Sequence, residues 1–241
     1  MFDKFIADFK LNFIDEDRWL SLVKGLGTTL EITLLSLVLG VVIGIIIASI
    51  RSTFDKNKDS LKRNGGLKYF LFKVLNGFCS LYLTVIRGTP VVVQLLISYF
   101  IIFASAKNGA MVAVFAFGIN SGAYVAEIFR SGIVSVDNGQ FEAGRSLGFN
   151  YFQTMIHIII PQAFKTVLPT LCNEFIVLIK ETSVAGYVGV MDLTKAGDII
   201  RGRTFSAFMP LIAVALIYLL LVIILTALVK RLERRLRKNE R

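Results

Sequence analysis

Long uncharged, apolar stretches alternate with charged segments along this chain. The clearest stretch, residues 32–50, runs for nineteen residues without a charge, and residues 205–229 form another. A helix needs roughly 20 residues, at a rise of about 1.5 Å each, to cross a bilayer core about 30 Å thick. Both stretches therefore predict membrane-spanning helices.

Three more segments are apolar enough to cross a membrane, and they lie at residues 90–106, 110–134 and 163–179. Residues 67–86 are less uniform, because lysine, asparagine and serine side chains interrupt them. That segment predicts an amphipathic helix on the inner membrane surface. The whole pattern predicts an all-α, polytopic membrane protein with about five transmembrane helices.

The distribution of charge sets the orientation of these spans. Residues 51–73 carry seven lysine or arginine residues, and residues 230–241 form a basic tail, KRLERRLRKNER. Loops that stay in the cytoplasm carry an excess of basic residues, so both segments are expected there. The arm before Lys24 lacks this bias, which puts the N-terminus outside. The net charge of +10 therefore indicates cytoplasmic loops and not a nucleic-acid-binding surface.

Small residues form a stripe along the first span. Gly40 and Gly44 have GxxxG spacing, and Ala48 follows one turn later. Small residues let a second helix approach closely, but they are also ordinary components of membrane helices. The sequence leaves both interpretations open.

Composition excludes several classes of protein. Apolar residues make up 55% and charged residues 18% of the chain, and the mean hydropathy is +0.68. These values disfavour disorder, a coiled coil or a soluble enzyme. The two cysteines are far apart and there is a single histidine, so neither a disulfide framework nor a metal site is expected. With no GxxxxGKS or GxxxxGKT phosphate-binding loop, we expect no catalytic residue and no bound cofactor.

Residues 140–163, QFEAGRSLGFNYFQTMIHIIIPQA, lie between two spans and are far less apolar than either. Their distinctive residues are, in order, Glu142, Ala143, Gly144, Gly148 and Pro161. This spacing resembles the EAA loop of ABC-importer permeases, E-A-A-x3-G-x9-I-x-L-P. Gly144 stands in place of the second alanine of that pattern, and Ile160 in place of its leucine.

The resemblance implies that this loop couples the chain to an ATPase. Because the chain lacks an ATP-binding motif, it must receive mechanical work from another protein. Two short helices joined at a glycine make a rigid element, and Ala143, Gly144 and Gly148 permit close packing in a partner's groove. Glu142 can cap a helix or pair with a basic residue of the partner. An ordinary cytoplasmic helical hairpin is the alternative interpretation.

Four more motifs narrow the resemblance: IRGTPVVVQ at 86–94, SGAYVAEIFR at 121–130, NEFI at 173–176 and KETS at 180–183. Together with the loop, they resemble the permease subunits of polar amino acid uptake systems, the histidine, arginine and glutamine group. The similarity extends over roughly residues 20–235.

This resemblance implies the type I ABC importer permease fold. It implies a single transmembrane domain over residues 1–241, with a coupling loop at about 136–162 and the basic tail at 230–241 in the cytoplasm. The location implied is the cytoplasmic membrane of a bacterium, with the N-terminus outside and the C-terminus in the cytoplasm.

The resemblance also implies a set of partners. Two ATP-binding cassette subunits, which hold ATP and magnesium, dock on the loops of two permease subunits, identical or related. An amino-acid-binding protein delivers the solute from outside, and the lipid bilayer surrounds the spans. ATP binding then drives the spans from an inward-facing to an outward-facing state. The alternative function is an ion-coupled secondary amino acid transporter, with Glu127 or Glu174 as its ion site.

Polar groups at membrane depth are costly and mark candidate solute contacts. The candidates are Gln94, Asn120, Tyr124, Glu127, Asn173 and Glu174. Asn120 and Tyr124 are four residues apart and share a helix face. The two carboxylates can hold an α-ammonium group or a cationic side chain, which favours a basic amino acid.

Each of these residues also has a structural alternative. Glu127 can form an ion pair with Arg130 or Arg87 instead of contacting a solute. Asn173 and Glu174 can form hydrogen bonds between helices, and the same holds for the glutamine of the second span.

Overall fold

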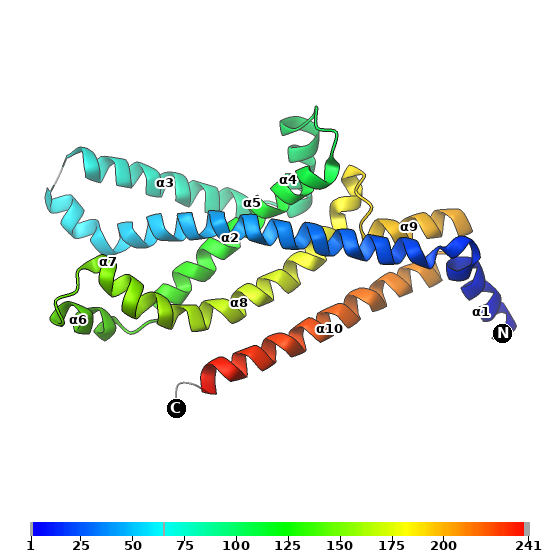
Figure 1. The fold of residues 1–241 in the computed structure, drawn as a ribbon. Coiled ribbons are helices and arrows are strands. Elements are labelled where there is room, and N and C mark those ends of the chain that lie inside the picture. Colours follow the sequence, from blue (N-terminus) through cyan, green and yellow to red (C-terminus); the bar gives the residue numbers. More distant parts are fainter. Residues whose placement is uncertain (1, 65, 239–241) are drawn as a thin grey trace. The chain divides into compact units, whose positions relative to one another are not determined.

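A computed structural model describes residues 2–64 and 66–238, and every regular element in these residues is a helix (Figure 1). The expected all-α class is therefore confirmed. The α-helices are α1 (Phe2–Phe9), α2 (Trp19–Asn64), α3 (Leu67–Gly88), α4 (Val91–Ile97), α5 (Gly109–Val134), α6 (Asn138–Ser146), α7 (Tyr151–Thr154), α8 (Ile160–Glu181), α9 (Leu193–Thr204) and α10 (Phe208–Lys238). Short π or 3-10 segments are η1 (Lys10–Ile14), η2 (Asp15–Asp17), η3 (Ser98–Ile102), η4 (Met155–Ile159) and η5 (Thr182–Val188).

The chain forms two compact units, each made of segments distant in the sequence. Unit 1 comprises residues 1–37, 90–118 and 175–228, and unit 2 comprises residues 38–89, 119–174 and 229–241. The expectation of one domain over residues 1–241 stays a prediction.

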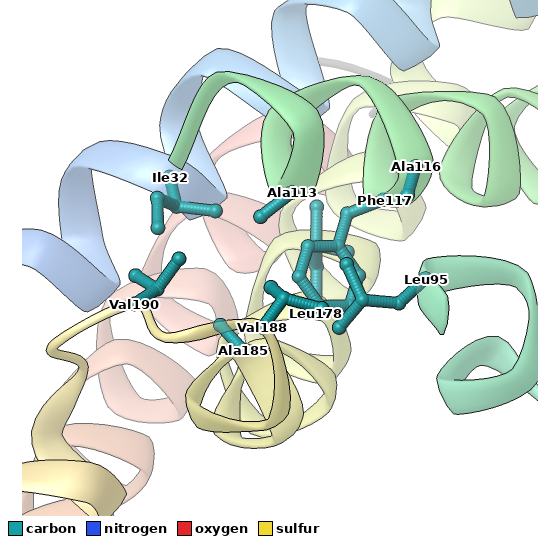
Figure 2. Packing of buried hydrophobic residues seen from close by; sticks show 9 residues of the cluster. All are labelled: Ile32, Leu95, Ala113, Ala116, Phe117, Leu178, Ala185, Val188 and Val190. Carbon is teal, nitrogen blue, oxygen red and sulfur yellow. The ribbon is translucent and has the colours of Figure 1, made fainter. Parts of the chain in front are cut away.

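Unit 1 has an apolar core to which α2, α4, α5, α8 and η5 contribute (Figure 2). Phe117, Leu95 and Leu178 are fully buried in it. Ala113 and Ala116 present small side chains along the same helix as Phe117, so neighbouring helices can pack closely there.

In the same unit, α9 is fixed by a buried carboxylate at its start. Asp192 is the N-cap, and its two carboxylate oxygens accept hydrogen bonds of 3.0 Å from the backbone amides of Thr194 and Lys195. Burial raises the pKa of this carboxyl above its usual range, and the hydrogen bonds offset part of the rise.

Unit 2 is built on close contact between α2 and α5. A Cβ atom added at Gly44 would lie 2.5 Å from Cγ1 of Val125 and 2.9 Å from the backbone nitrogen of Ala126. At Gly40 a Cβ would lie 3.0 Å from the side chain of Ser121. The glycine stripe therefore lets α5 approach the backbone of α2, and this interpretation of the GxxxG spacing is confirmed.

Within residues 2–64 and 66–238, five helical segments are long and apolar enough to cross a membrane, the number expected from the sequence. They are Trp19–Asp55, Tyr69–Gly88, Gly109–Val134, Tyr151–Val188 and Phe208–Leu236. The last of these segments begins at Phe208, whereas the sequence predicted a start at residue 205. Two of them, of 37 and 38 residues, exceed the roughly 20 residues that a bilayer core requires.

The second span differs from the expectation. The apolar helix Val91–Ile102 has only the 7 residues of α4 and the 5 of η3, about 18 Å in length. Residues 90–106 therefore do not make a complete span by themselves. Phe103 ends the helix, and Pro90, which has no amide hydrogen to donate, separates it from α3.

The prediction of a surface helix at residues 67–86 is also wrong. Its lysines lie in the first two turns of α3, and the remainder is apolar enough to span. Cys79 and Leu83 are buried in a cluster with Ile47 of α2 and Ala123 of α5. The hydroxyl of Tyr82 donates a 2.5 Å hydrogen bond to the carbonyl of Ile119. The C-terminal half of α3 is thus part of a helical bundle.

Candidate functional site

The predicted coupling loop is a hairpin of two short helices, α6 and α7, in unit 2 (Figure 1). Asp137 caps α6, because its side chain accepts a 2.6 Å hydrogen bond from the amide of Gly139. At the other end, the amide of Gly148 donates to the carbonyl of Arg145 (2.9 Å), and the amide of Phe149 donates to that of Gly144 (3.1 Å). This pair of bonds is a Schellman motif, and Gly148 adopts its left-handed conformation with φ of 84°.

The second helix of the hairpin begins with a capping box. The side chain of Asn150 accepts from the amide of Gln153, and the side chain of Gln153 accepts from the amide of Asn150, both at 2.9 Å. Only residues 147–150 separate the two helices. Both ends of the turn are therefore fixed by hydrogen bonds.

Gly144 brings the two arms of the hairpin together. It is buried, and a Cβ atom there would lie 2.7 Å from Cγ2 of Thr154 and 3.0 Å from Cδ1 of Ile158. Such distances are too short for an ordinary contact. The glycine that replaces the second alanine of the loop pattern is thus required by the packing of this hairpin.

The tip of the hairpin exposes apolar side chains. Leu147 is 74% exposed and Phe152 is 70% exposed. Glu142 and Ala143 on α6 are also exposed. Pro161 is exposed near the start of α8, which follows η4 without a break in the helical segment Tyr151–Val188. The loop therefore presents an apolar tip with an acidic residue nearby, a surface that a partner protein can cover.

Two of the predicted solute residues are buried in unit 2. The side chain of Asn120 is 2% exposed, and that of Glu174 is 9% exposed. Oε1 of Glu174 accepts a 3.0 Å hydrogen bond from the hydroxyl of Ser121 on α5. The alternative role for Glu174, a hydrogen bond between helices, is thus confirmed within this subunit. Sequence reasoning missed Ser121, because a serine in a membrane helix is not distinctive by itself.

Glu127 lies in an ionic cluster with Tyr124. Arg130 donates two hydrogen bonds to Oε1 of Glu127, at 2.7 and 3.2 Å. Nη1 of Arg87 lies 3.9 Å from Oε2, and the guanidinium carbon of Arg87 lies 5.6 Å from the ring centroid of Tyr124. The ion-pair alternative for Glu127 is therefore confirmed. Tyr124 faces the end of α3, although Asn120, one turn before it, is buried.

Asn173 belongs to a polar face of α8. It is exposed within the subunit, as are Thr166 and Thr170, which precede it by seven and three residues. These side chains line a cavity of about 210 Å³ together with Glu233 of α10. The two threonines were missed because neither is charged, but their helical spacing with Asn173 is a signal that the sequence contains.

Gln94 lies on α4 in unit 1, where it is half-buried. The other five predicted solute residues are in unit 2. Of these five, the structure places Tyr124 and Glu127 around one arginine, and Asn120 and Glu174 are both buried.

Residues 65–238 match the family model described as "Binding-protein-dependent transport system inner membrane component". The arginine transport system permease protein ArtQ of Bacillus subtilis (strain 168) is 38% identical over 176 residues, 72% of this chain and 80% of that protein. The glutamine transport system permease protein GlnP of Escherichia coli (strain K12) is 38% identical over 169 residues, 68% of this chain and 77% of that protein.

A similar solved structure is a crystal structure of an amino acid ABC transporter with histidines. Its TM-score is 0.79 at 38% identity, with 92% of this chain and 98% of that chain covered. The expected type I importer permease fold is therefore confirmed. These relatives are transporter permeases and not enzymes, and they give no support to an ion-coupled secondary transporter.

Proposed function

The chain belongs to the family of binding-protein-dependent transport system inner membrane components, and from this premise we propose that it carries polar, chiefly basic, amino acids into a bacterial cell in an ATP-driven complex. In this proposal two copies of the chain, or this chain and a related permease, form the path. Two ATP-binding cassette subunits hold ATP and magnesium, and an external binding protein supplies the amino acid.

The observation that carries the proposal is the hairpin of α6 and α7. It is fixed at both ends by hydrogen bonds, and Gly144 packs its arms together. At its tip, Leu147 is exposed to the extent of 74%. A rigid element with an apolar tip is what a mechanical contact requires, because movement of a partner is then transmitted and not absorbed.

The polar face of α8 supports a solute path. Asparagine and threonine side chains that point out of a membrane helix need water or a second protein beside them, because lipid offers them no hydrogen bonds. Asn173 and Thr166 are such side chains, whereas the hydroxyl of Thr170 donates a 2.9 Å hydrogen bond to the carbonyl of Thr166. Adjacent to Asn173 in sequence, Glu174 supplies a buried carboxyl group, which in its ionised form would favour a cationic solute over an anionic one.

The substrate class also has support from the relatives. One named relative belongs to an arginine transport system, another to a glutamine transport system, and a similar solved structure is an amino acid transporter with histidines. Orientation follows from charge: the basic stretches at 51–73 and 230–241 are on the cytoplasmic side, with the N-terminus outside.

The test uses the complete complex with its ATPase subunits and a loaded binding protein. Leu147→Asp puts a charge at the apolar tip, and Leu67→Asp is a matched control because Leu67 is 72% exposed at the start of α3. Central interface residues typically contribute about 2 kcal/mol or more. We therefore expect L147D to lower amino-acid-stimulated ATP hydrolysis by at least about tenfold and L67D to leave it unchanged. Equal rates for L147D and the wild type would refute the coupling role.

A further inference from the structure

The first helix of unit 1, α1, has an exposed apolar face. Phe5 is 53% exposed, and Ile6 and Phe9 are exposed to a similar extent. These three residues share one face of the helix, whereas Lys4 and Ala7 lie on the opposite side. Neither the coupling hairpin nor the polar face of α8 accounts for this amphipathic helix.

A tight turn fixes the direction of α1. In Figure 1, α1 turns sharply away from the first turns of α2. Glu16 and Asp17 form this turn in the left-handed region, with φ of 56° and 51°. Residues with a side chain adopt that conformation only when their surroundings hold them in it. Arg18 does so here, because it lies 3.0 Å from the carboxylate of Glu16 and donates a hydrogen bond to the carbonyl of Leu11.

A buried asparagine attaches the same segment to α9. Asn12 is fully buried, and its side-chain amide donates a 2.7 Å hydrogen bond to the carbonyl of Asp8 in α1. Its Oδ1 atom accepts a 2.8 Å hydrogen bond from the hydroxyl of Thr204, the last residue of α9. A helix of 8 residues is too short to be stable in water by itself, so these contacts hold α1 in place.

Phe13 sets the level of α1 relative to the membrane. Its side chain is buried in a cluster with Leu22 of α2 and Val214 of α10. The ring of Phe9 lies 5.1 Å from that of Phe13, between centroids. Leu22 and Val214 belong to the first two turns of the first and last membrane-spanning segments. The base of α1 is therefore level with the point where these two segments enter the bilayer.

Both spans expose apolar side chains at this level. On α2 they are Trp19 and Val23, and on α10 they are Phe208 and Leu211. Aromatic residues are typical of the positions where spans enter a bilayer. The apolar face of α1 therefore adjoins span surfaces that lipid can cover, and lipid is the partner that this position favours.

We propose that α1 lies along the membrane surface with Phe5, Ile6 and Phe9 inserted among the lipids. Amphipathic helices of this kind bury their apolar face about 5–10 Å into the boundary of headgroups and acyl chains. The polar residues Asp3, Lys4 and Asp8 carry no excess of positive charge. Apolar burial, and not attraction to anionic headgroups, therefore provides the contact.

In this arrangement α1 anchors the beginning of α2 and of α10 at the membrane surface, because Phe13 packs against both helices. The charge of residues 51–73 makes this the outer surface. Only that choice of side rests on the proposed function.

The experiment places a photoreactive benzophenone amino acid at position 5 or position 7 of the chain. The complete complex is illuminated in nanodiscs of phosphatidylcholine and phosphatidylglycerol, and mass spectrometry of the chain identifies the attached molecule. Ala7 is a matched control, because it is exposed like Phe5 but lies about 160° from it around the helix.

A second measurement compares Phe5→Asp with Ala7→Asp, which add the same charge to the two sides of α1. Hydrogen exchange of the amides in the last turn of α1 reports how firmly the helix is held. Because the two variants alter only this short helix, the remainder of the complex serves as an internal reference.

We expect position 5 to attach phospholipid at least about tenfold more often than position 7, the ratio that corresponds to burial of one phenyl side chain. For the same reason, exchange in F5D should be at least about tenfold faster than in A7D.

Three results would overturn the proposal. Equal attachment of lipid at positions 5 and 7 would mean that the helix has no preferred face towards the membrane. Attachment of position 5 to a second permease subunit or to the external binding protein, in place of lipid, would assign the face to a protein interface. Equal exchange in F5D and A7D would show that the apolar face does not hold α1. None of these readouts depends on transport or ATP hydrolysis, so they are separate from the test of the proposed function.

Discussion

Gly148 offers a sharp test of how the coupling hairpin is built. It ends α6 with φ of 84°, a left-handed conformation that costs other residues roughly 1–2 kcal/mol. A Cβ atom at this position would meet nothing within 4 Å. Substitutions here therefore change backbone strain without creating a clash, and the effect can be assigned to a single cause.

We compare Gly148→Val with Gly148→Asn. Asparagine tolerates the left-handed conformation, whereas a β-branched side chain does not. A loss of about 1–2 kcal/mol lowers the ratio of closed to open hairpin by about 5–30-fold. The amide of Phe149 reports this opening directly, because it donates to the carbonyl of Gly144 in the closed hairpin.

The assay is hydrogen exchange of the Phe149 amide in the assembled complex. We expect exchange in G148V to be about 5–30-fold faster than in the wild type, and exchange in G148N to stay within about threefold of it. Amino-acid-stimulated ATP hydrolysis should fall in G148V for the same reason. The same exchange rate in both variants would refute the assignment of strain to this turn.

Two further predictions concern packing and charge. Gly44→Ala places a methyl group against the backbone of Ala126 and should lower the free energy of unfolding by about 1–3 kcal/mol. Gly27→Ala, in open space on the same helix, should leave it unchanged. Equal midpoints of thermal unfolding in the two variants would contradict the close approach of α2 and α5. Asp192→Ala should lower the free energy of unfolding by about 0.5–2 kcal/mol, because the helix cap is lost, whereas Asp192→Asn should leave it unchanged. Burial raises the pKa of Asp192 in the folded protein. The stability of the wild type should therefore fall as the pH rises from about 4 through this raised pKa. An unfolding midpoint of D192N with the same pH dependence as the wild type would contradict this prediction.

The number of spans could be predicted from the sequence because an uncharged helix of sufficient length has few alternatives in a membrane. The limits of the second span could not. The lysines of α3 suggested a helix at the membrane surface, but Cys79 and Leu83 in its apolar half are buried against α2 and α5. The sequence pattern indicates how apolar a helix is and not which neighbour it packs against.

The coupling loop was recognisable because its function depends on residues at fixed spacing. The spacing did not explain why position 144 holds glycine in place of alanine, since the reason is the position of Thr154 ten residues later. The roles of the charged residues were also set by tertiary structure. Glu127 was a candidate for binding a solute until the structure placed Arg130 against it.

Arg51 of α2 and Arg87 of α3 line one cavity of unit 2, and the sequence contained no signal of it. Its two arginines are 36 positions apart, and each one alone is typical of the charged edge of a membrane span. They line the same cavity only because α2 and α3 pack together in unit 2. Such sites depend on helix pairing, which the sequence pattern of one chain does not specify.

The contact between the hairpin tip and an ATP-binding subunit can be measured by photo-crosslinking in the intact complex. A benzophenone amino acid replaces Leu147 in one sample and Phe205 in a second. Phe205 is 95% exposed and shortly precedes the start of α10, which is expected outside the cell. Crosslinking to the ATP-binding subunit from position 147 and none from position 205 is the predicted result. No crosslink from position 147 would contradict the account.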